Sequence, residues 1–256
     1  KMIANVRTAA RTVGRRCPVV MDLGGPKVRV ETVSTTVKRI FRGDIFRLAF
    51  RESDCGGEGL CFTINFPEAA RKLSAGAPVY INDGKIGARV VSSDARGVDL
   101  QVTVAREKGE KLKPEKGFNM PSVELDISPL TPKDLADLDF VAEQADVIGY
   151  SFVQRPADID LLVDELARRR GGRERQPLLL KIETALAVRN LPRLLIAAGG
   201  RHPIGVMIAR GDLAMEVGPE RLSEVQEEIL WLCEAAHVPA VWATQVLESL
   251  IKNGAP

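Results

Sequence analysis

The most constraining feature of this sequence is a pattern that recurs along its second half. A short apolar run ends in polar residues, and an amphipathic segment with helical periodicity follows. Because the apolar runs are continuous rather than alternating, they are typical of strands buried on both faces, as in a parallel sheet covered by helices. The strands are predicted over 146–150, 178–182, 205–209 and 239–243, and the helices over 157–169, 184–198, 220–236 and after 245.

Two architectures contain such a sheet: a (β/α)₈ barrel and an open doubly wound sheet. The sequence has no GxGxxG or Walker-type phosphate loop, which weakens the case for the open sheet. Polar residues at the carboxyl ends of successive strands favour the barrel, whose active sites gather on that face. The predicted fold class is therefore α/β, of the (β/α)₈ TIM-barrel type, with only part of the barrel in this chain.

Residues 32–119 follow a different pattern. They contain short β runs separated by Gly-Asp, Asn-Asp-Gly and Ala-Arg-Gly turns, and helical periodicity is nearly absent outside 67–73. This predicts a small all-β domain inserted between a first barrel segment, 1–31, and a second, 120–256. A domain inserted beside the mouth of a barrel is well placed to act as a lid.

Composition excludes several classes of protein. A net charge of +2 gives no case for nucleic-acid binding, and the basic run 168–175 is interpreted as a solvated connector. No apolar segment is long enough to cross a membrane, and no signal-peptide pattern opens the chain. Cys17, Cys55, Cys61 and Cys233 show no CxxC spacing, so we expect free thiols and a cytoplasmic protein. A metal or disulfide shared by Cys55 and Cys61 is the alternative.

Polar residues at the ends of three neighbouring strands form the candidate site. Lys181 and Glu183 are two residues apart on one strand, so their side chains point to the same face. Asp212 and Thr244 follow the next two strands. Two carboxylates suit Mg²⁺, and a lysine beside the metal stabilises a developing oxyanion. These residues predict chemistry on an enolate or on a transferring phosphoryl group.

Motifs along nearly the whole chain resemble those of the pyruvate kinase family. They are MDLGGPKVRV, YINDGKI, EKGFNMP, SFVQRPADI, LLLKIET, VMIARGDLAMEV and WATQVLESLIK. The family fold is a (β/α)₈ barrel with a β lid after the third strand, so the resemblance implies that this chain holds strands three to seven and the lid. It also implies the glycolytic transfer of a phosphoryl group from phosphoenolpyruvate to ADP, giving pyruvate and ATP, with Mg²⁺ or Mn²⁺.

The resemblance implies a role for each candidate residue in the barrel. Lys181 would stabilise charge on the phosphoryl group and the enolate. Glu183 and Asp212 would hold the divalent metal. The backbone N–H groups of Gly211 and Asp212 would bind the substrate carboxylate at a helix start. Thr244 would lie beside that carboxylate, near the carbon that is protonated.

The resemblance extends to the nucleotide and to a monovalent cation. Arg29 and Lys116 would contact phosphate oxygens, and Asp83 would approach on lid closure. The family's cation site uses an Asp-Thr pair, but this chain has Asp22 followed by leucine, which offers no side-chain oxygen. Other departures on the nucleotide side, which leave the nucleotide preference open, are Gly24, Asn82 and Glu115.

Lys27 stands where potassium-dependent members carry glutamate. Its ammonium could occupy the place of the ion, so together with Leu23 it predicts an enzyme that does not require potassium. Segments of the family expected before Lys1 and after Pro256 are outside this chain, and five parallel strands cannot close a barrel. We therefore expect residues 1–256 alone to be inactive, and the intact protein to be a homo-oligomer.

Two other functions are compatible with the sequence. Leu23, Gly24 and Asn82 would suit a non-catalytic relative that binds phosphoenolpyruvate or metal. The same barrel mouth would also suit a metal-dependent lyase or aldolase that forms the enolate of pyruvate. Tight substrate binding without turnover would indicate the first function, and release of pyruvate without nucleotide would indicate the second.

Overall fold

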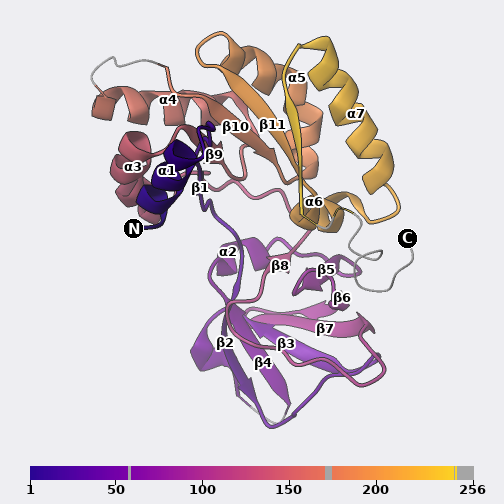
Figure 1. The fold of residues 1–256 in the computed structure, drawn as a ribbon. Coiled ribbons are helices and arrows are strands. Elements are labelled where there is room, and N and C mark those ends of the chain that lie inside the picture. Colours follow the sequence, from indigo (N-terminus) through magenta and orange to yellow (C-terminus); the bar gives the residue numbers. More distant parts are fainter. Residues whose placement is uncertain (57–58, 171–174, 245, 247–256) are drawn as a thin grey trace. The chain divides into compact units, whose positions relative to one another are not determined.

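The computed structural model describes residues 1–56, 59–170, 175–244 and 246. The chain divides into two compact units (Figure 1). The α/β unit comprises Lys1–Pro26, Ile127–Leu213 and Glu220–Pro256, and the β unit comprises Lys27–Asp126 and Ala214–Pro219. The helix expected after residue 245 and the middle of the basic connector, 171–174, lie outside the described residues.

The α/β unit is built on a parallel sheet in the order β1-β9-β10-β11-β12. Each strand of this unit is added next to the preceding one, always in the same direction across the sheet. A doubly wound sheet reverses direction at a switch point, whereas a (β/α)₈ barrel does not. The strands are β1 (Val20–Leu23), β9 (Val147–Tyr150), β10 (Leu178–Ile182), β11 (Ile204–Ala209) and β12 (Ala240–Ala243).

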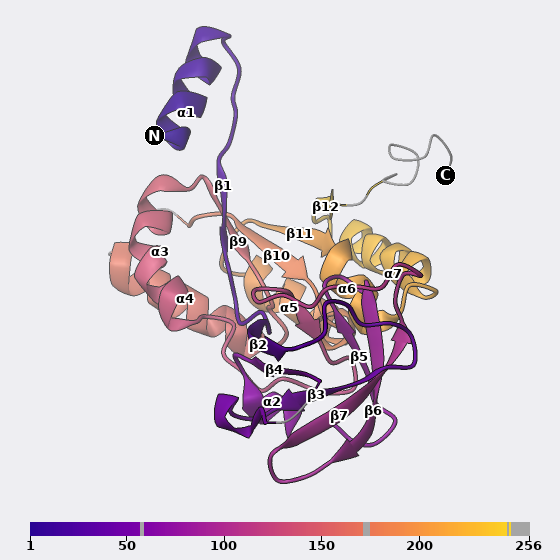
Figure 2. The same ribbon diagram turned by 90° about the horizontal axis from the view of Figure 1, so that it is seen from below.

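Helices follow the strands and contact one another and the sheet (Figure 1). They are α3 (Pro132–Gln144), α4 (Pro156–Arg170), α5 (Ala185–Gly199), α6 (Arg210–Val217) and α7 (Leu222–Ala235). Helix α1 (Met2–Thr12) has no buried residue and projects from the sheet in Figure 2. No helix among the described residues is long and apolar enough to span a membrane.

The start of α3 follows directly from its sequence. Thr131 caps the helix by accepting the backbone N–H of Asp134, and the Asp134 carboxylate accepts the N–H of Thr131 in return. Pro132 occupies the first turn, where its missing N–H costs nothing. This reciprocal cap fixes the position of the buried Asp134 carboxylate, which the site uses again below.

The β unit contains a seven-stranded sheet in the order β2-β4-β3-β7-β6-β5-β8. A bridge between Arg29 and Gly117 joins its two ends, and the N–H of Phe118 donates to the carbonyl of Val28 at 2.9 Å, so the sheet is a nearly closed barrel. It also contains helix α2 (Pro67–Ala70) and the 3₁₀ turn η1 (Glu52–Asp54). The strands are β2 (Val30–Thr35), β3 (Ile45–Ala49), β4 (Leu60–Ile64), β5 (Pro78–Ile81), β6 (Ile86–Ser93), β7 (Gly97–Val104) and β8 (Phe118–Asn119).

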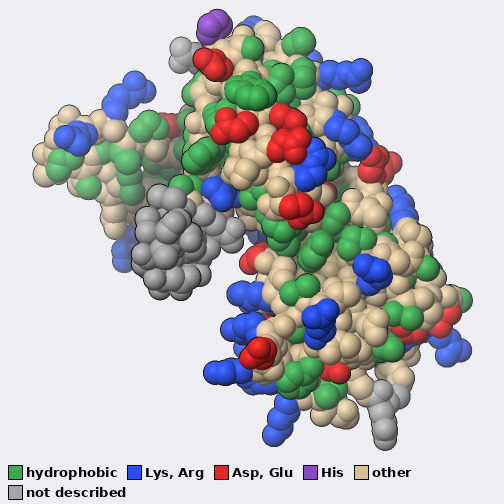
Figure 3. Space-filling model, turned by 90° about the vertical axis from the view of Figure 1, so that its right-hand side faces the viewer, with side chains coloured by type: hydrophobic (Ala, Val, Ile, Leu, Met, Phe, Trp, Pro, Cys, Tyr) green, Lys and Arg blue, Asp and Glu red, His purple; other side chains and the backbone are tan. Residues whose placement is uncertain are grey.

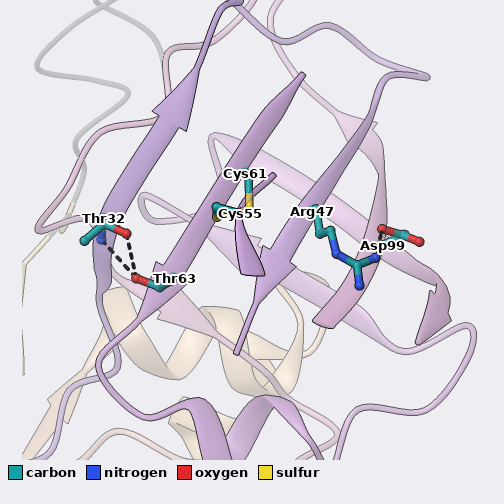
Figure 4. Close-up of a disulfide and its surroundings, with 6 residues drawn as sticks. All are labelled: Thr32, Arg47, Cys55, Cys61, Thr63 and Asp99. Atoms are coloured by element: carbon teal, nitrogen blue, oxygen red, sulfur yellow. Dashed lines mark hydrogen bonds and ion pairs between the residues drawn. A yellow bond between two sulfur atoms is a disulfide. The ribbon is translucent and has the colours of Figure 1, made fainter. Parts of the chain in front are cut away.

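The core of the β unit is centred on aromatic rings. Phe62 is fully buried, and its ring centroid lies 5.6 Å from that of Phe46 and 5.8 Å from that of Phe118. Two polar pairs tie strands together, since the hydroxyls of Thr32 and Thr63 are 2.8 Å apart and Arg47 is bonded to Asp99 (Figure 4). The β unit therefore has a hydrophobic core of its own.

The expectation of free thiols is wrong for two of the four cysteines. Cys55 and Cys61 form a disulfide that joins η1 to β4 (Figure 4). The fold brings their Cα atoms to 5.6 Å, which is within the range that a disulfide spans. Cys17 and Cys233 are free.

Candidate active site

The ammonium group of Lys181 lies at the centre of a polar cluster at the carboxyl edge of the parallel sheet. Its Nζ donates to Asp22 Oδ2 at 3.0 Å and to Ser151 Oγ at 2.8 Å, and it lies 3.5 Å from Glu183 Oε1. The side chains of Lys181 and Glu183 are only 13% and 5% exposed. Three neighbouring strands, β1, β9 and β10, and the residues that directly follow them thus hold one largely buried positive charge.

Burial and charge have opposite effects on Lys181. Burial lowers the pKa of its ammonium, but the carboxylates of Glu183 and Asp22 raise that pKa by more, and the result is above the ordinary value. The side chain is therefore charged at neutral pH. A fixed cation in a partly desolvated site is suited to stabilise negative charge that develops on a reacting oxygen.

Asp22 reaches Lys181 because the neighbouring strand leaves space for its carboxylate. Gly149 on β9 is the register partner of Asp22 on β1. A Cβ atom at Gly149 would lie 2.0 Å from Asp22 Oδ1, a distance that no real contact permits. Glycine at position 149 is thus required for the observed position of the Asp22 carboxylate.

Two buried carboxylates fix the turns that follow β1 and β9. Glu183 Oε2 accepts the N–H of Phe152 at 2.6 Å, and Phe152 has the left-handed φ of 55°. Asp134 accepts the N–H groups of Gly24 at 2.7 Å and Gly25 at 3.2 Å. Gly25 also has a positive φ, of 69°, and a Cβ there would lie 2.8 Å from the Phe152 ring. The turns on either side of the Lys181 cluster are thereby held against each other.

Gly211, Asp212 and Thr244 lie at the carboxyl ends of the next two strands. Helix α6 begins at Arg210, directly after β11, so Gly211 and Asp212 are in its first turn. Thr244 follows β12 with a left-handed φ of 60°. A Cβ at Gly211 would lie 3.8 Å from Thr244 Oγ1, so this hydroxyl is adjacent to the start of α6.

The β unit contains the three residues predicted to bind the nucleotide, Arg29, Lys116 and Asp83. They gather at the seam where the two ends of its sheet meet. Arg29 Nη1 donates to the carbonyl of Glu115 at 2.9 Å, next to Lys116. The N–H of Asn82, which precedes Asp83, donates to the carbonyl of Gly117 at 2.9 Å. One end of the β barrel therefore brings together residues that are far apart in the sequence.

The residues of the expected monovalent-cation site have other contacts. Leu23 is 1% exposed and belongs to the core of the α/β unit, so it offers no ligand atom. Asp22 is already paired with the Lys181 ammonium. Lys27, in the β unit, lies against Gly117, where an added Cβ would come within 3.2 Å of Lys27 Cε.

The donors available for a divalent metal are few. No group of three or more His, Cys, Asp or Glu side chains among the described residues is arranged to hold an ion. Glu183 and Asp212 supply carboxylates from the ends of adjacent strands. Mg²⁺ commonly takes one or two protein carboxylates and completes its shell with water and substrate oxygens, so the chemistry of this pair fits Mg²⁺.

Three residues of this site were not identified from the sequence: Ser151, Gly149 and Asp134. Gly149 had a detectable signal, because a glycine inside a strand often marks a close approach of another group. The Thr-Pro-Lys-Asp segment that ends at Asp134 also had the form of a helix cap. The contact of Ser151 with Lys181 depends on strand register, which the sequence does not specify.

Comparison with known proteins identifies the family of this chain. Residues 1–256 match the model of the pyruvate kinase barrel domain. Pyruvate kinase of Geobacillus stearothermophilus is 31% identical over 257 aligned residues, covering 100% of this chain and 42% of the relative. Pyruvate kinase of Mycobacterium intracellulare is 31% identical over 252, covering 98% and 50%.

A third relative, pyruvate kinase of Clostridium perfringens, is 29% identical over 239 aligned residues, covering 93% of this chain and 48% of the relative. The chain therefore spans at most half the length of these relatives. The family model confirms the predicted fold class, and with it the interpretation of the parallel sheet as part of a (β/α)₈ barrel. The chain belongs to the pyruvate kinase family.

Proposed function

We propose that the intact protein transfers a phosphoryl group from phosphoenolpyruvate to ADP, giving pyruvate and ATP in the cytoplasm, as a homo-oligomer. The observation that carries this proposal is the Lys181 ammonium, held by Asp22, Ser151 and Glu183 at the carboxyl edge of the sheet. Phosphoryl transfer depends mainly on positioning and on stabilising charge, and a fixed buried cation supplies both.

Glu183 and Asp212 are the residues we propose to hold Mg²⁺ or Mn²⁺. When bound, the ion would neutralise charge on the substrate oxygens. Gly211 and Asp212, in the first turn of α6, would bind the substrate carboxylate through backbone N–H groups. The Thr244 hydroxyl, adjacent to Gly211, would contact the same carboxylate and assist protonation of the enolate.

The β unit would act as a lid that carries the nucleotide contacts. Arg29, Lys116 and Asp83 meet at the seam of its barrel, and a shared location supports a shared ligand. Catalysis would not require potassium, since Leu23 is a core residue and Asp22 is neutralised by Lys181. The described residues hold five parallel strands, which cannot close a barrel, so activity is proposed for the intact protein rather than for residues 1–256 alone.

The test is ADP- and Mg²⁺-dependent formation of pyruvate by the intact protein, with and without potassium. Lys181→Met should lower kcat by about 100-fold to 1,000-fold, the usual cost of removing one fixed group that stabilises an oxyanion. Lys72→Met, at an exposed lysine of the β unit, is the matched control and should retain activity. The rate without potassium should be within about twofold of the rate with it, because Lys27 and Lys181 already supply positive charge.

Two outcomes would select another function. Phosphoenolpyruvate bound tightly by the wild-type protein without turnover would indicate a non-catalytic relative. Pyruvate released from an aldol substrate without nucleotide would indicate a metal-dependent lyase or aldolase.

A further inference from the structure

A basic hollow in the β unit shares Lys116 and Asn82 with the nucleotide side described above, and its other lining residues have no part in the proposed function. Its volume is about 260 Å³, and five cationic side chains, one carboxylate and one amide line it: Arg39, Arg106, Lys111, Lys113, Lys116, Glu110 and Asn82. A smaller hollow of about 190 Å³ shares four of these residues and adds Lys38. Figure 3 shows Lys and Arg side chains crowded along one edge of the β unit. Like charges this close together repel one another, and an anion bound among them would relieve that repulsion.

The two arginines are held in place before any ligand arrives. Arg106 bonds Glu110 through Nε and through Nη2, the latter at 3.1 Å, and the Glu110 side chain is 5% exposed. Arg39 Nη1 donates to the carbonyl of Gly109 at 2.7 Å. A guanidinium has five N–H donors, so these contacts leave donors for a ligand. Groups that are already ordered lose less conformational entropy on binding.

Lys111 and Lys113 are both exposed and flank a buried leucine. Leu112 between them is 8% exposed and points into the core, so Lys111 and Lys113 point outward together. Reciprocal backbone hydrogen bonds of 2.9 Å between Ile40 and Glu110 fix this segment beside Arg39. The four cationic groups that have no role in the proposed reaction therefore converge from two neighbouring segments.

We propose that this hollow binds a small molecule that carries two or more phosphate groups, at a site distinct from the reaction centre. Planar arginine forks and lysine ammonium groups are the side chains that bind phosphate oxygens best. Its volume is below the range for whole drug-sized ligands and suits a polyphosphate group. A nucleic acid fits poorly, because none of the described residues that line the hollow is aromatic and available for base stacking. Arg29 and Asp83 are not among the lining residues.

Binding of inorganic tripolyphosphate and of glucose 1,6-bisphosphate to the intact protein, measured by calorimetry, tests this site. The first probe has contiguous phosphates and the second has separated ones, so the tighter of the two identifies the spacing that the site accepts. Arg106→Gln with Lys111→Gln should weaken binding at least about tenfold, since each charge-assisted hydrogen bond commonly contributes that much. Arg51→Gln with Lys72→Gln removes the same charge from exposed positions outside the hollow and should leave affinity within twofold.

Three results would overturn the proposal. They are no binding of either probe by the wild-type protein, equal weakening in the two double variants, and loss of binding in Lys116→Gln but not in Arg106→Gln with Lys111→Gln. The last result would assign the anion to the proposed nucleotide residues instead. Pyruvate formation by the Arg106→Gln, Lys111→Gln protein should equal that of the wild type, so this test and that of the proposed function can fail independently.

Discussion

The two units of this chain organise polar residues in opposite ways. In the α/β unit, parallel strands in register end at one edge, so Lys181, Asp22 and Ser151 meet although they are far apart in the sequence. In the β unit, mostly antiparallel strands close into a barrel, and polar groups are distributed over its outer face and its seam. The parallel sheet thus collects polar side chains at the ends of its strands. The barrel protects its edges and has its own core.

Whether the two cores are stable independently of each other can be tested by weakening one core at a time. Phe62→Ala removes the ring at the centre of the β-unit core and should cost about 3–5 kcal/mol of its stability. Hydrogen exchange should accelerate in β6 and β7, while Trp231 and Trp242, both in the α/β unit, should report an unchanged unfolding transition. Leu180→Ala, at a fully buried position of β10, is the reciprocal control and should have the opposite pattern. If Phe62→Ala destabilised the β unit and also shifted the unfolding transition reported by the tryptophans, the two units would unfold as one.

The contact between Asp22 and Lys181 at the edge of the parallel sheet can be disrupted by adding one methyl group at Gly149. Gly149→Ala places a Cβ where the Asp22 carboxylate lies and should displace Asp22 from Lys181. Such displacements of about 1 Å commonly cost about 100-fold in rate, so kcat for pyruvate formation should fall by that factor. Gly199→Ala, whose Cβ would have an ordinary 3.5 Å contact with Ile204, should leave kcat unchanged. Equal kcat values for Gly149→Ala and Gly199→Ala would contradict the role of Asp22 in holding the Lys181 ammonium.

The disulfide is a further difference between the two units, because both of its cysteines are in the β unit. Cys55→Ser with Cys61→Ser opens a short covalent loop and should lower the stability of the β unit by about 2 kcal/mol. Thermal unfolding with and without reductant should show the same loss in the wild type and no effect of reductant in the variant. Cys17→Ser, at an exposed free cysteine, is the control. Insensitivity of the wild type to reductant would contradict the bond.

The smallest effect concerns a surface ion pair of the β unit. Hydrogen bonds from Arg47 and from the backbone of Arg96 lower the pKa of Asp94 from 3.8 to about 2. Since the folded pKa is the lower one, this pair contributes stability above about pH 4 that is lost as the pH falls through about 2. Asp94→Asn should therefore lower Tm slightly at pH 5, and the difference from the wild type should vanish near pH 2. A difference that is constant between these pH values would rule out the ion pair as its cause.

Much of the fold could be predicted because its elements carry strong local patterns. Periodicity predicted helices close to α4, α5 and α7, whose apolar faces pack inward. It did not predict α6 as a separate helix, because eight residues that include both apolar and charged side chains produce no clear face. The pairing of Cys55 with Cys61 was predicted only as the alternative to free thiols, since sequence separation alone does not tell whether two Cα atoms lie within bonding distance.

The candidate site could likewise be predicted from the sequence only in part. Lys181 and Glu183 could be assigned to one face from their spacing alone, and strand ends placed Asp212 and Thr244 at the same edge. The contacts of Lys181 with Asp22 and Ser151 depend on which strands are neighbours and in what register, and both are tertiary properties. The chemical roles of these residues stay predictions until the variants are measured.

The seam of the β barrel also has a consequence for the exchange of chain segments in such a protein. Val28, just before β2, and Phe118, in β8, are hydrogen-bonded, so the chain enters and leaves the strands of the β barrel at adjacent points. A segment with adjacent ends can be exchanged for a longer, a shorter or an unrelated one without stretching the connection between its flanking elements. The stretch from Val28 to Phe118 is in this sense exchangeable, and grafting experiments or natural recombination could replace it.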